Sequence, residues 1–482
     1  MIDFRPILFI VGILLSTLAL AMTLPAMADL LVNNPDWQVF ASAAALTLFI
    51  GLALILSTRS ATRRINLRQA FVLTALCWLV IPTFGALPFT FSALDMHYPD
   101  AFFEAMSGVT TTGSTVIVGL DQAPPGILLW RALLQWLGGI GIIAMAITVL
   151  PLLQVGGMQL FRMESSDKSE KAMPRTAQLA GWTGVIYLGL TLLCAILYWV
   201  AGMSGFDAVA HAMTTIATGG YSTHDNSIGF FGSAWVDTIA VIFMLIGSLP
   251  FVLYLRALRG NPGSLWRDEQ VRLFLTIVGI AVAVMTLYLH MKNGVEAMAA
   301  LRLAAFNVVS IITGTGYATT DFGLWGGFAV AALFCMMFIG GCAGSTTCGL
   351  KVFRFQVLYA AANIQIRRLL QPNGVFIPYY NRKPISEQVL ASVMAFFFLF
   401  ILCWAALAIG LGFTGLDFLT ATSGAASAIA NVGPGLGDMI GPAGNFSEVP
   451  IAAKWMLSFG MLLGRLELFT ILVLLMPSFW RA

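Results

Sequence analysis

The sequence predicts an all-α polytopic membrane protein with about ten spanning helices, in which an N-terminal helical hairpin precedes four helix–re-entrant loop–helix repeats around one axis. Of the 482 residues, 59% are hydrophobic and only 10% are charged, and the mean hydropathy is +0.88. A soluble protein of this size would need far more polar surface. Apolar runs of about 20 residues, long enough to cross a bilayer, recur along the chain. Between them, a glycine-containing loop occurs four times.

The apolar runs fall into two length classes. Ten are long enough to span, at residues 7–27, 39–57, 71–90, 126–152, 182–202, 235–256, 272–291, 326–354, 388–412 and 453–477. Four are too short and are typical of re-entrant half-helices, at 99–112, 206–218, 297–313 and 417–431. They divide the chain into a hairpin (1–65), four repeats (66–160, 176–260, 268–356 and 388–482) and a cytoplasmic linker (357–387).

The N-terminus resembles a signal peptide. Arg5 precedes an apolar run, and Ala26–Ala28 mimics a cleavage site. However, the run from Ile7 to Leu24 is long and leads directly into a second run, Val39 to Ile55. This pattern favours an uncleaved first helix of the hairpin, with removal of residues 1–28 as the alternative.

Basic residues gather on alternate connections. When the ten spans are threaded, most of the 25 Lys and Arg residues fall on one side, together with both termini. The positive-inside rule assigns that side to the cytoplasm of a bacterial inner membrane. Acids such as Asp95, Asp121 and Asp225 lie on the other side. They are either solvated loop residues or raise the cation concentration at an outer mouth. The net charge of only +3 gives no indication of a nucleic-acid-binding surface.

The four loops each follow a half-helix directly. They are Thr110–Ser114, Ala217–Tyr221, Thr313–Tyr317 and Ala430–Pro434, and their shared glycines are Gly113, Gly220, Gly316 and Gly433. Non-helical backbone at membrane depth is tolerated where it lines a water-filled path or is buried in protein. Glycine allows the backbone to turn carbonyl oxygens toward a common axis, where they replace the hydration shell of an ion. A half-helix entering from outside also points its negative end at that ion, which favours a cation.

Close helix packing through Gly and Thr is the alternative explanation of these loops. Four occurrences between pairs of spans favour a filter. No loop contains a complete Thr-Val-Gly-Tyr-Gly, and the four differ from one another. The predicted selectivity is therefore real but imperfect.

At these residues the chain resembles the Trk/Ktr/HKT superfamily of cation transporters, and within it the TrkH-type potassium uptake subunit. The resemblance runs essentially end to end and is strongest at Thr110–Thr115, Trp136–Gly141, Pro151–Met158, Phe306–Ser310, Thr313–Tyr317 and Asn431–Gly435. The resemblance implies potassium uptake through a gated channel-like pore. The implied filter residues are Thr111, Thr112, Gly113, Thr218, Gly219, Gly220, Gly314, Thr315, Gly316, Asn431, Val432 and Gly433, with potassium on the backbone carbonyls of Thr112, Gly219, Thr315 and Val432.

The resemblance also implies partners. It implies a homodimer with one pore per protomer, and a TrkA-like cytosolic ring that binds NAD or ATP/ADP and regulates opening. Any nucleotide then sits on that partner, and no organic cofactor is expected in this chain. The residues leave open whether transport is coupled to protons or sodium.

The span at 326–354 is interrupted. Its stretch Ile339–Gly349 is too rich in Gly, Ser and Thr for a continuous helix. The resemblance makes this stretch an intramembrane gating loop below the filter; the alternative is a flexible kink without a gating role. The implied gate residues are Gly340, Gly341, Gly344, Ser345, Thr346, Gly349 and Arg465.

Arg465 lies inside the last span. A charge at this depth costs about 2.5–3.5 kcal/mol on insertion scales, so it usually faces a pore or a partner. The resemblance implies that Arg465 projects into the pore, where it repels cations and bonds the carbonyls of the gating loop. The alternatives are an ion pair with Glu467 or snorkelling to the surface. Arg131 and Lys454, near the outer ends of spans, are predicted to be interface anchors.

Two other functional classes fit less well. A secondary transporter of another cation or small solute also uses broken helices, but usually in two inverted halves. An enzyme is not indicated, because the sequence has no Walker A, His-Glu-x-x-His or Gly-x-Ser-x-Gly motif. The six cysteines and four histidines show no metal-ligand spacing.

Overall fold

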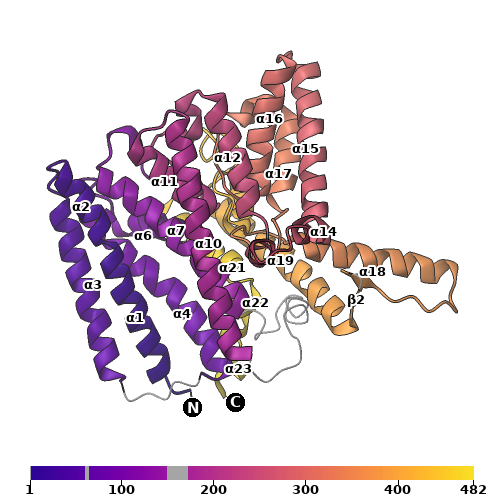
Figure 1. The fold of residues 1–482 in the computed structure, drawn as a ribbon, viewed down its shortest axis with the longest axis horizontal. Helices are drawn as coiled ribbons and strands as arrows, with labels where there is room; N and C mark the ends of the chain where they lie inside the picture. Colours follow the sequence, from indigo (N-terminus) through magenta and orange to yellow (C-terminus); the bar gives the residue numbers. More distant parts are fainter. Residues whose placement is uncertain (1, 60–64, 149–171, 382, 482) are drawn as a thin grey trace.

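The computed structural model describes residues 2–59, 65–148, 172–381 and 383–481. These ranges are mostly helical, and the single sheet within them is the two-stranded pair β1 (Tyr379–Tyr380) and β2 (Lys383–Pro384). The all-α class predicted from the sequence is therefore confirmed (Figure 1).

The N-terminal hairpin consists of α1 (Arg5–Ala21), α2 (Thr23–Leu31) and α3 (Trp37–Ser57). α1 and α3 approach closely at Gly12 and Gly51, where a Cβ atom on Gly12 would lie 2.8 Å from the Gly51 carbonyl oxygen. Small residues commonly permit such contacts between membrane helices. The hairpin is tied to the first repeat by Asp29, which is fully buried and accepts a 2.7 Å hydrogen bond from the Gly126 amide. This carboxylate lies at the positive N-terminal end of the helix that begins at Pro125.

Each repeat contains an entering helix, a half-helix and a second helix. Repeat one comprises α4 (Leu67–Gly85), α5 (Leu87–Phe91), half-helix α6 (Tyr98–Val109), η1 (Leu120–Gln122) and α7 (Pro125–Thr148). Repeat two comprises α10 (Ala172–Val200), half-helix α11 (Gly205–Ile216), η2 (Ser227–Phe231), α12 (Ala234–Gly247) and α13 (Phe251–Leu258), followed by α14 (Ser264–Arg267).

Repeats three and four follow the same order. Repeat three comprises α15 (Glu269–Asn293), half-helix α16 (Ala297–Ile312), η3 (Phe322–Trp325) and α17 (Gly327–Met337), and α18 (Val352–Leu370) follows it. Repeat four comprises α19 (Glu387–Phe413), half-helix α20 (Phe418–Ala430), α21 (Ile451–Arg465) and α22 (Phe469–Leu475), followed by α23 (Pro477–Arg481).

Among the described residues, seven helices are long and apolar enough to cross a membrane, or nine if each of two bent pairs counts as one span. The eighth predicted span, 326–354, contains α17, which ends at Met337 and gives way to the predicted break. Part of the predicted span 126–152 lies outside the described residues, as do Pro151–Met158 of the resemblance.

The two bends were not expected from the sequence. α12 and α13 meet at 92°, and α21 and α22 meet at 114°. Pro250 explains the first bend, because it disfavours the helical conformation at Leu249 and lacks an amide hydrogen. The second bend is made by Glu467 and Leu468, whose φ angles are +56° and +50°. Both bends lie near the break between α17 and α18, as described below.

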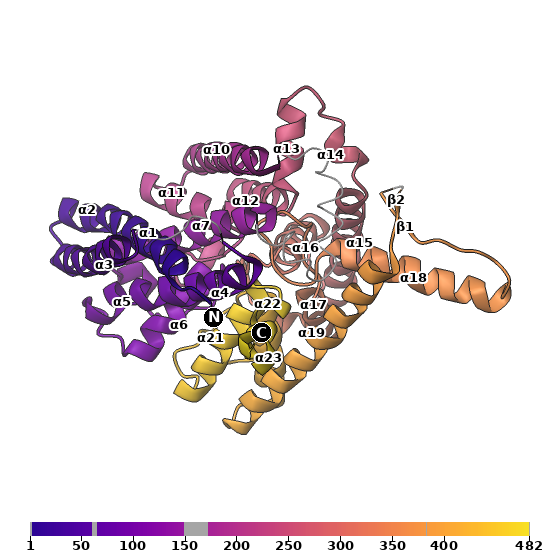
Figure 2. The same cartoon turned by 90° about the horizontal axis from the view of Figure 1, so that it is seen from below.

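Both chain termini lie at the same end of the molecule (Figure 1). α18, with β1 and β2 beside it, projects sideways from the helix bundle in both views (Figures 1 and 2). Because α18 extends from Val352 to Leu370, the first half of the predicted linker at 357–387 is helical.

Candidate ion pore

The four re-entrant loops have the same backbone conformation. Two residues before each shared glycine, φ is positive, at Thr111 (+53°), Thr218 (+50°), Gly314 (+67°) and Asn431 (+51°). The glycines themselves also have positive φ, at Gly113 (+91°), Gly220 (+77°), Gly316 (+82°) and Gly433 (+109°). Between these positions, the amides of Thr112, Gly219, Thr315 and Val432 donate hydrogen bonds of 2.9–3.0 Å to the carbonyls of Ser107, Thr214, Ser310 and Ser427. The backbone therefore adopts the same turn in all four loops.

The four turns meet in a closed ring. A Cβ atom on each glycine would lie against a carbonyl oxygen of the next loop: Gly113 at 2.2 Å from Gly219, Gly220 at 1.8 Å from Thr315, Gly316 at 2.3 Å from Val432, and Gly433 at 2.8 Å from Thr112. The contacts run from loop one to two, three, four and back to one. Only glycine combines this close approach with a positive φ. The structure thus brings together all four segments singled out in the sequence.

The half-helices add their dipoles to the ring. Each of α6, α11, α16 and α20 ends directly at its loop, so its negative end faces the ring. Acids lie at the opposite ends. Asp417 accepts hydrogen bonds from the amides of Leu419 (3.0 Å) and Thr420 (3.1 Å) at the start of α20. Hydrogen bonds from Thr420 and Leu419 hold the pKa of Asp417 below its usual range. The field at the ring therefore favours a cation.

A buried ion pair braces loops one and two. Arg131 on α7 and Glu104 on α6 are 1% and 0% exposed and are joined by a 2.8 Å contact. The Glu104 carboxylate also accepts from the Val116 amide at 2.9 Å, and Arg131 donates to the Ser222 carbonyl at 2.7 Å. The Arg131 guanidinium lies 4.1 Å from the centroid of the Tyr221 ring. Thus one charge pair connects the outer ends of both loops.

The prediction that Arg131 and Lys454 are interface anchors was wrong. Both are buried, and Lys454 bonds Asp100 at 2.6 Å. Their acidic partners lie on half-helix α6, 27 and 354 residues away. An acid inside an apolar half-helix was the available signal, because such a charge requires a partner.

The break between α17 and α18 is a compact loop, residues 338–351, called the gating loop below after the role that the sequence analysis expects of it. Its two ends pair as a parallel bridge between Ile339 and Leu350. A Cβ atom on Gly340 would lie 2.1 Å from the Cys348 carbonyl oxygen, so the two ends approach at backbone distance. Inside the loop, Gly344 has a φ of +77°, and the Ser345 hydroxyl donates to the Cys342 carbonyl at 2.6 Å.

The gating loop contacts repeat two and the ring. The amide of Cys342 donates to the Ser248 carbonyl at 3.1 Å, and that of Thr346 to the Gly247 carbonyl at 3.2 Å. These acceptors form the α12–α13 bend. The Thr346 hydroxyl is also 3.1 Å from that of Thr218 in the second re-entrant loop. Of the other expected gate glycines, Gly341 would carry a Cβ atom 2.6 Å from the Thr347 hydroxyl, and Gly349 has a φ of +73°.

Arg465 joins three repeats. Its guanidinium donates to the Gly138 carbonyl at 3.0 Å and to the Thr346 carbonyl at 3.3 Å, and it also contacts the Cys348 sulfur. Arg465 is 1% exposed, so it does not snorkel to the surface. Glu467 pairs with Arg354 instead of Arg465. The expected hydrogen bond to a carbonyl of the gating loop is present, and both alternatives for Arg465 were wrong.

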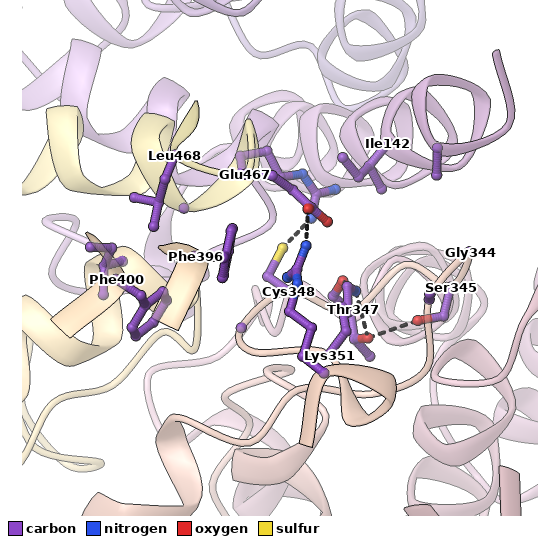
Figure 3. A pocket seen from close by; sticks show the side chains of 17 residues that line it. Ile142, Gly344, Ser345, Thr347, Cys348, Lys351, Phe396, Phe400, Glu467 and Leu468 are labelled. Carbon is purple, nitrogen blue, oxygen red and sulfur yellow. Dashed lines mark hydrogen bonds and ion pairs between the residues drawn. The ribbon is translucent and has the colours of Figure 1, made fainter. Parts of the chain in front are cut away.

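A cavity lies beside the gating loop (Figure 3). It is bounded by α7 at Ile142, by the end of α20 at Ile429 and by the α21–α22 bend. Phe396 and Phe400 form its apolar side. Its charged residues are Lys351, Arg354, Arg465 and Glu467. The cavity therefore brings the gating loop and Arg465 together beside the end of half-helix α20.

No group of three or more His, Cys, Asp or Glu side chains in the described ranges has an arrangement that could hold a metal ion. The sequence analysis did not predict the ion pair between Glu104 and Arg131. It also did not predict the role of Gln135, whose amide reaches from α7 to the second re-entrant loop.

Four re-entrant loops closed into one ring of main-chain carbonyls, within a bundle of membrane-spanning helices, define a pore-loop protein for cation transport. Comparison with known proteins gives the family. The family model for TrkH, described as a cation transport protein, matches residues 36–481. The chain belongs to the TrkH family of cation transport proteins, a family of transporters and not of enzymes.

The relatives match this chain over nearly their whole length. The chain is 46% identical over 480 residues to the Trk system potassium uptake protein TrkI of Halomonas elongata, covering 99% of this chain and 97% of that protein. It is 40% identical to the Trk system potassium uptake protein TrkH of Salmonella typhimurium, covering 99% of both. The crystal structure of the potassium transporter TrkH from Vibrio parahaemolyticus superposes with a TM-score of 0.93, at 38% identity and with full coverage of both chains.

Proposed function

We propose that this protein takes up potassium across a bacterial inner membrane through a gated, moderately selective, channel-like pore. The closed ring of four glycine loops carries the proposal. Relatives of 38–46% identity that bear the names of potassium uptake proteins support the choice of ion.

The ring is the proposed selectivity filter. In this assignment the carbonyls of Thr112, Gly219, Thr315 and Val432 coordinate potassium in place of water. Those four carbonyls are the ones that meet the glycines of the neighbouring loops. Because the four loops differ in side chains, fewer complete rings form than in a uniform filter, and sodium is rejected incompletely.

The gating loop and Arg465 are the proposed gate. The hydrogen bonds of Arg465 to Gly138 and Thr346 hold the loop beside the ring and add a positive charge to the path. Opening requires that these bonds break. We assign the trigger to a TrkA-like cytosolic ring that binds NAD or ATP/ADP, acting on a homodimer whose termini face the cytoplasm. An interior-negative potential supplies about 2.3 kcal/mol per charge per 100 mV, which is sufficient for uptake without a coupled ion.

Ion flux in proteoliposomes tests the proposal. The purified chain is reconstituted and flux of potassium, rubidium and sodium is measured, with and without the cytosolic regulator, against empty vesicles. We expect potassium and rubidium to pass faster than sodium. A potassium-to-sodium flux ratio near one would contradict the selective filter. Absence of potassium flux both with and without the regulator would contradict the proposed function. Dependence of potassium flux on a proton or sodium gradient would instead indicate a secondary transporter.

A further inference from the structure

Filter loop two departs from the other three at one position. Where loops one, three and four carry Thr112, Thr315 and Val432, loop two carries Gly219. Gly219 does not have a positive φ, unlike Gly220 beside it. Its backbone conformation would therefore accept a side chain, and backbone geometry does not explain the glycine.

The space beside Gly219 is filled by Gln135 of α7. A Cβ atom on Gly219 would lie 2.4 Å from Cδ of Gln135 and 2.5 Å from its Oε1. Real Cβ atoms essentially never approach that closely. Gln135 is 0% exposed. A side chain at position 219 would therefore displace the Gln135 amide from its present place.

Both ends of the Gln135 amide bind loop two. Nε2 donates to the Gly219 carbonyl at 2.6 Å, and Oε1 accepts from the Tyr221 amide at 3.0 Å. The two contacts lie on either side of Gly220, whose own contact with the Thr315 carbonyl is part of the ring. Gln135 therefore clamps the part of loop two that faces the axis.

Loops one and three are held by their own hydroxyls. Thr112 and Thr110 share a 2.7 Å hydrogen bond, and Thr315 and Thr313 share another of 2.7 Å. Loop two has Ala217 and Gly219 at the corresponding positions, and so has no hydroxyl at either. The Gln135 amide fills the space that a side chain at position 219 would need, whereas loop four, with Ala430 and Val432, also lacks the hydroxyl pair.

We propose that Gln135 is the positioning residue of filter loop two, which fixes the Gly219 carbonyl and thereby sets the discrimination between potassium and sodium. The proposal rests on the filter function proposed above. Sodium is smaller than potassium, and a carbonyl must move inward to coordinate it. A carbonyl held from behind by Gln135 resists that movement, whereas a released carbonyl follows the smaller ion. Loss of one such hydrogen bond predicts a fall of about fivefold in the potassium-to-sodium flux ratio.

The first test replaces Gln135 by Leu, which keeps the bulk and removes both hydrogen bonds. We expect a potassium-to-sodium ratio about fivefold lower, with potassium flux retained. The matched control is Gln69→Leu, which also removes a buried amide with two hydrogen bonds, to Asn66 and Asp3, at the start of α4 and outside the filter loops. Its ratio should equal that of the wild type. Equal ratios in Gln135→Leu and the wild type would overturn the proposal.

The second test is a rescue that a merely structural role would not give. Gly219→Thr alone should lower the ratio, because the new side chain collides with Gln135. Gln135→Ala alone should lower it, because the clamp is lost. The double variant has space for the threonine that loops one and three carry, and should recover most of the ratio. A double variant no better than the two single changes combined would overturn the proposal.

A binding measurement covers the case in which a variant conducts poorly. Potassium in the ring should raise the thermal unfolding midpoint of the detergent-solubilised protein more than sodium does, and Gln135→Leu should shrink that difference. An unchanged difference would contradict the proposal. If wild-type protein itself shows no preference for potassium, the proposed function fails; if the wild type discriminates and Gln135→Leu does so equally, only the role of Gln135 fails.

Discussion

Replacement of Arg465 by Gln should increase potassium flux in the absence of any regulator. Arg465 is buried beside the gating loop, and its positive charge faces a cavity that also contains Lys351. The nearby Arg354 is paired with Glu467, so its charge is largely compensated. In the proposed gate, Arg465 and Lys351 therefore supply the positive charge that repels a potassium ion at this point.

The size of the effect follows from Coulomb's law. Two like charges at a closest approach of about 4 Å repel by about 4 kcal/mol at an effective dielectric constant of 20. Water in the cavity screens part of this, and a residual barrier of about 2 kcal/mol corresponds to roughly a 30-fold change in rate. We therefore expect Arg465→Gln to raise basal flux by about 30-fold.

A second variant separates charge from hydrogen bonding. Arg465→Lys keeps the charge but loses the fork that reaches both Gly138 and Thr346. If charge is the barrier, flux of Arg465→Lys stays near that of the wild type; if the loop is the barrier, flux rises as in Arg465→Gln. The control is Arg259→Gln, an exposed arginine outside the cavity. Flux is measured in proteoliposomes at matched protein content, and unchanged or lower flux in well-folded Arg465→Gln would refute the reasoning.

Three further changes test the supports of the ring. Arg131→Leu leaves the Glu104 charge buried without its partner and should cost about 3–5 kcal/mol, seen as a lower unfolding midpoint in detergent, whereas an unchanged midpoint would contradict the bracing role. Asp417→Ala should cost roughly 1 kcal/mol as a lost N-cap. Because the pKa of Asp417 is lowered from 3.8, that stabilisation is present above about pH 4 and is lost as pH falls through the lowered pKa, so the wild type and Asp417→Ala should converge in unfolding midpoint under acid. Gly220→Ala places a Cβ atom 1.8 Å from the Thr315 carbonyl oxygen and should abolish potassium-dependent thermal stabilisation, while retained stabilisation would argue against the ring.

The filter loops could be found from the sequence because their signal is local. Each combines an apolar segment too short to span with a glycine directly after it, and the combination recurs between pairs of spans. The interruption of the third repeat was equally visible, since Ile339–Gly349 has a composition unsuited to a helix. These features depend on the conformational preferences of adjacent residues.

The supports of the loops depend on contacts between distant residues. Gln135 lies 84 residues before Gly219, and nothing near it in sequence marks its contact. The unusual Gly219–Gly220 pair was the only sign that another side chain fills the space. The bend at Glu467 and Leu468 had no sequence signal at all, because neither residue type favours positive φ. Tertiary contacts stabilise that conformation, including the ion pair of Glu467 with Arg354.

The repeats are equivalent at the ring and unequal beside it, and the difference has a physical reason. An ion in a filter is coordinated from all sides, so four loops must present the same backbone. A blocked path needs only one obstructing segment, so the second helices are free to differ. α7 continues without a break to Thr148, α12 and α21 bend, and α17 ends in the gating loop. Both bends contact that loop, through Gly247 in one case and Arg465 in the other. α18 begins at Val352, directly after the loop, and projects from the bundle (Figure 2). A partner that moves α18 would therefore act directly on the gating loop, which contacts the ring through Thr346 and Thr218.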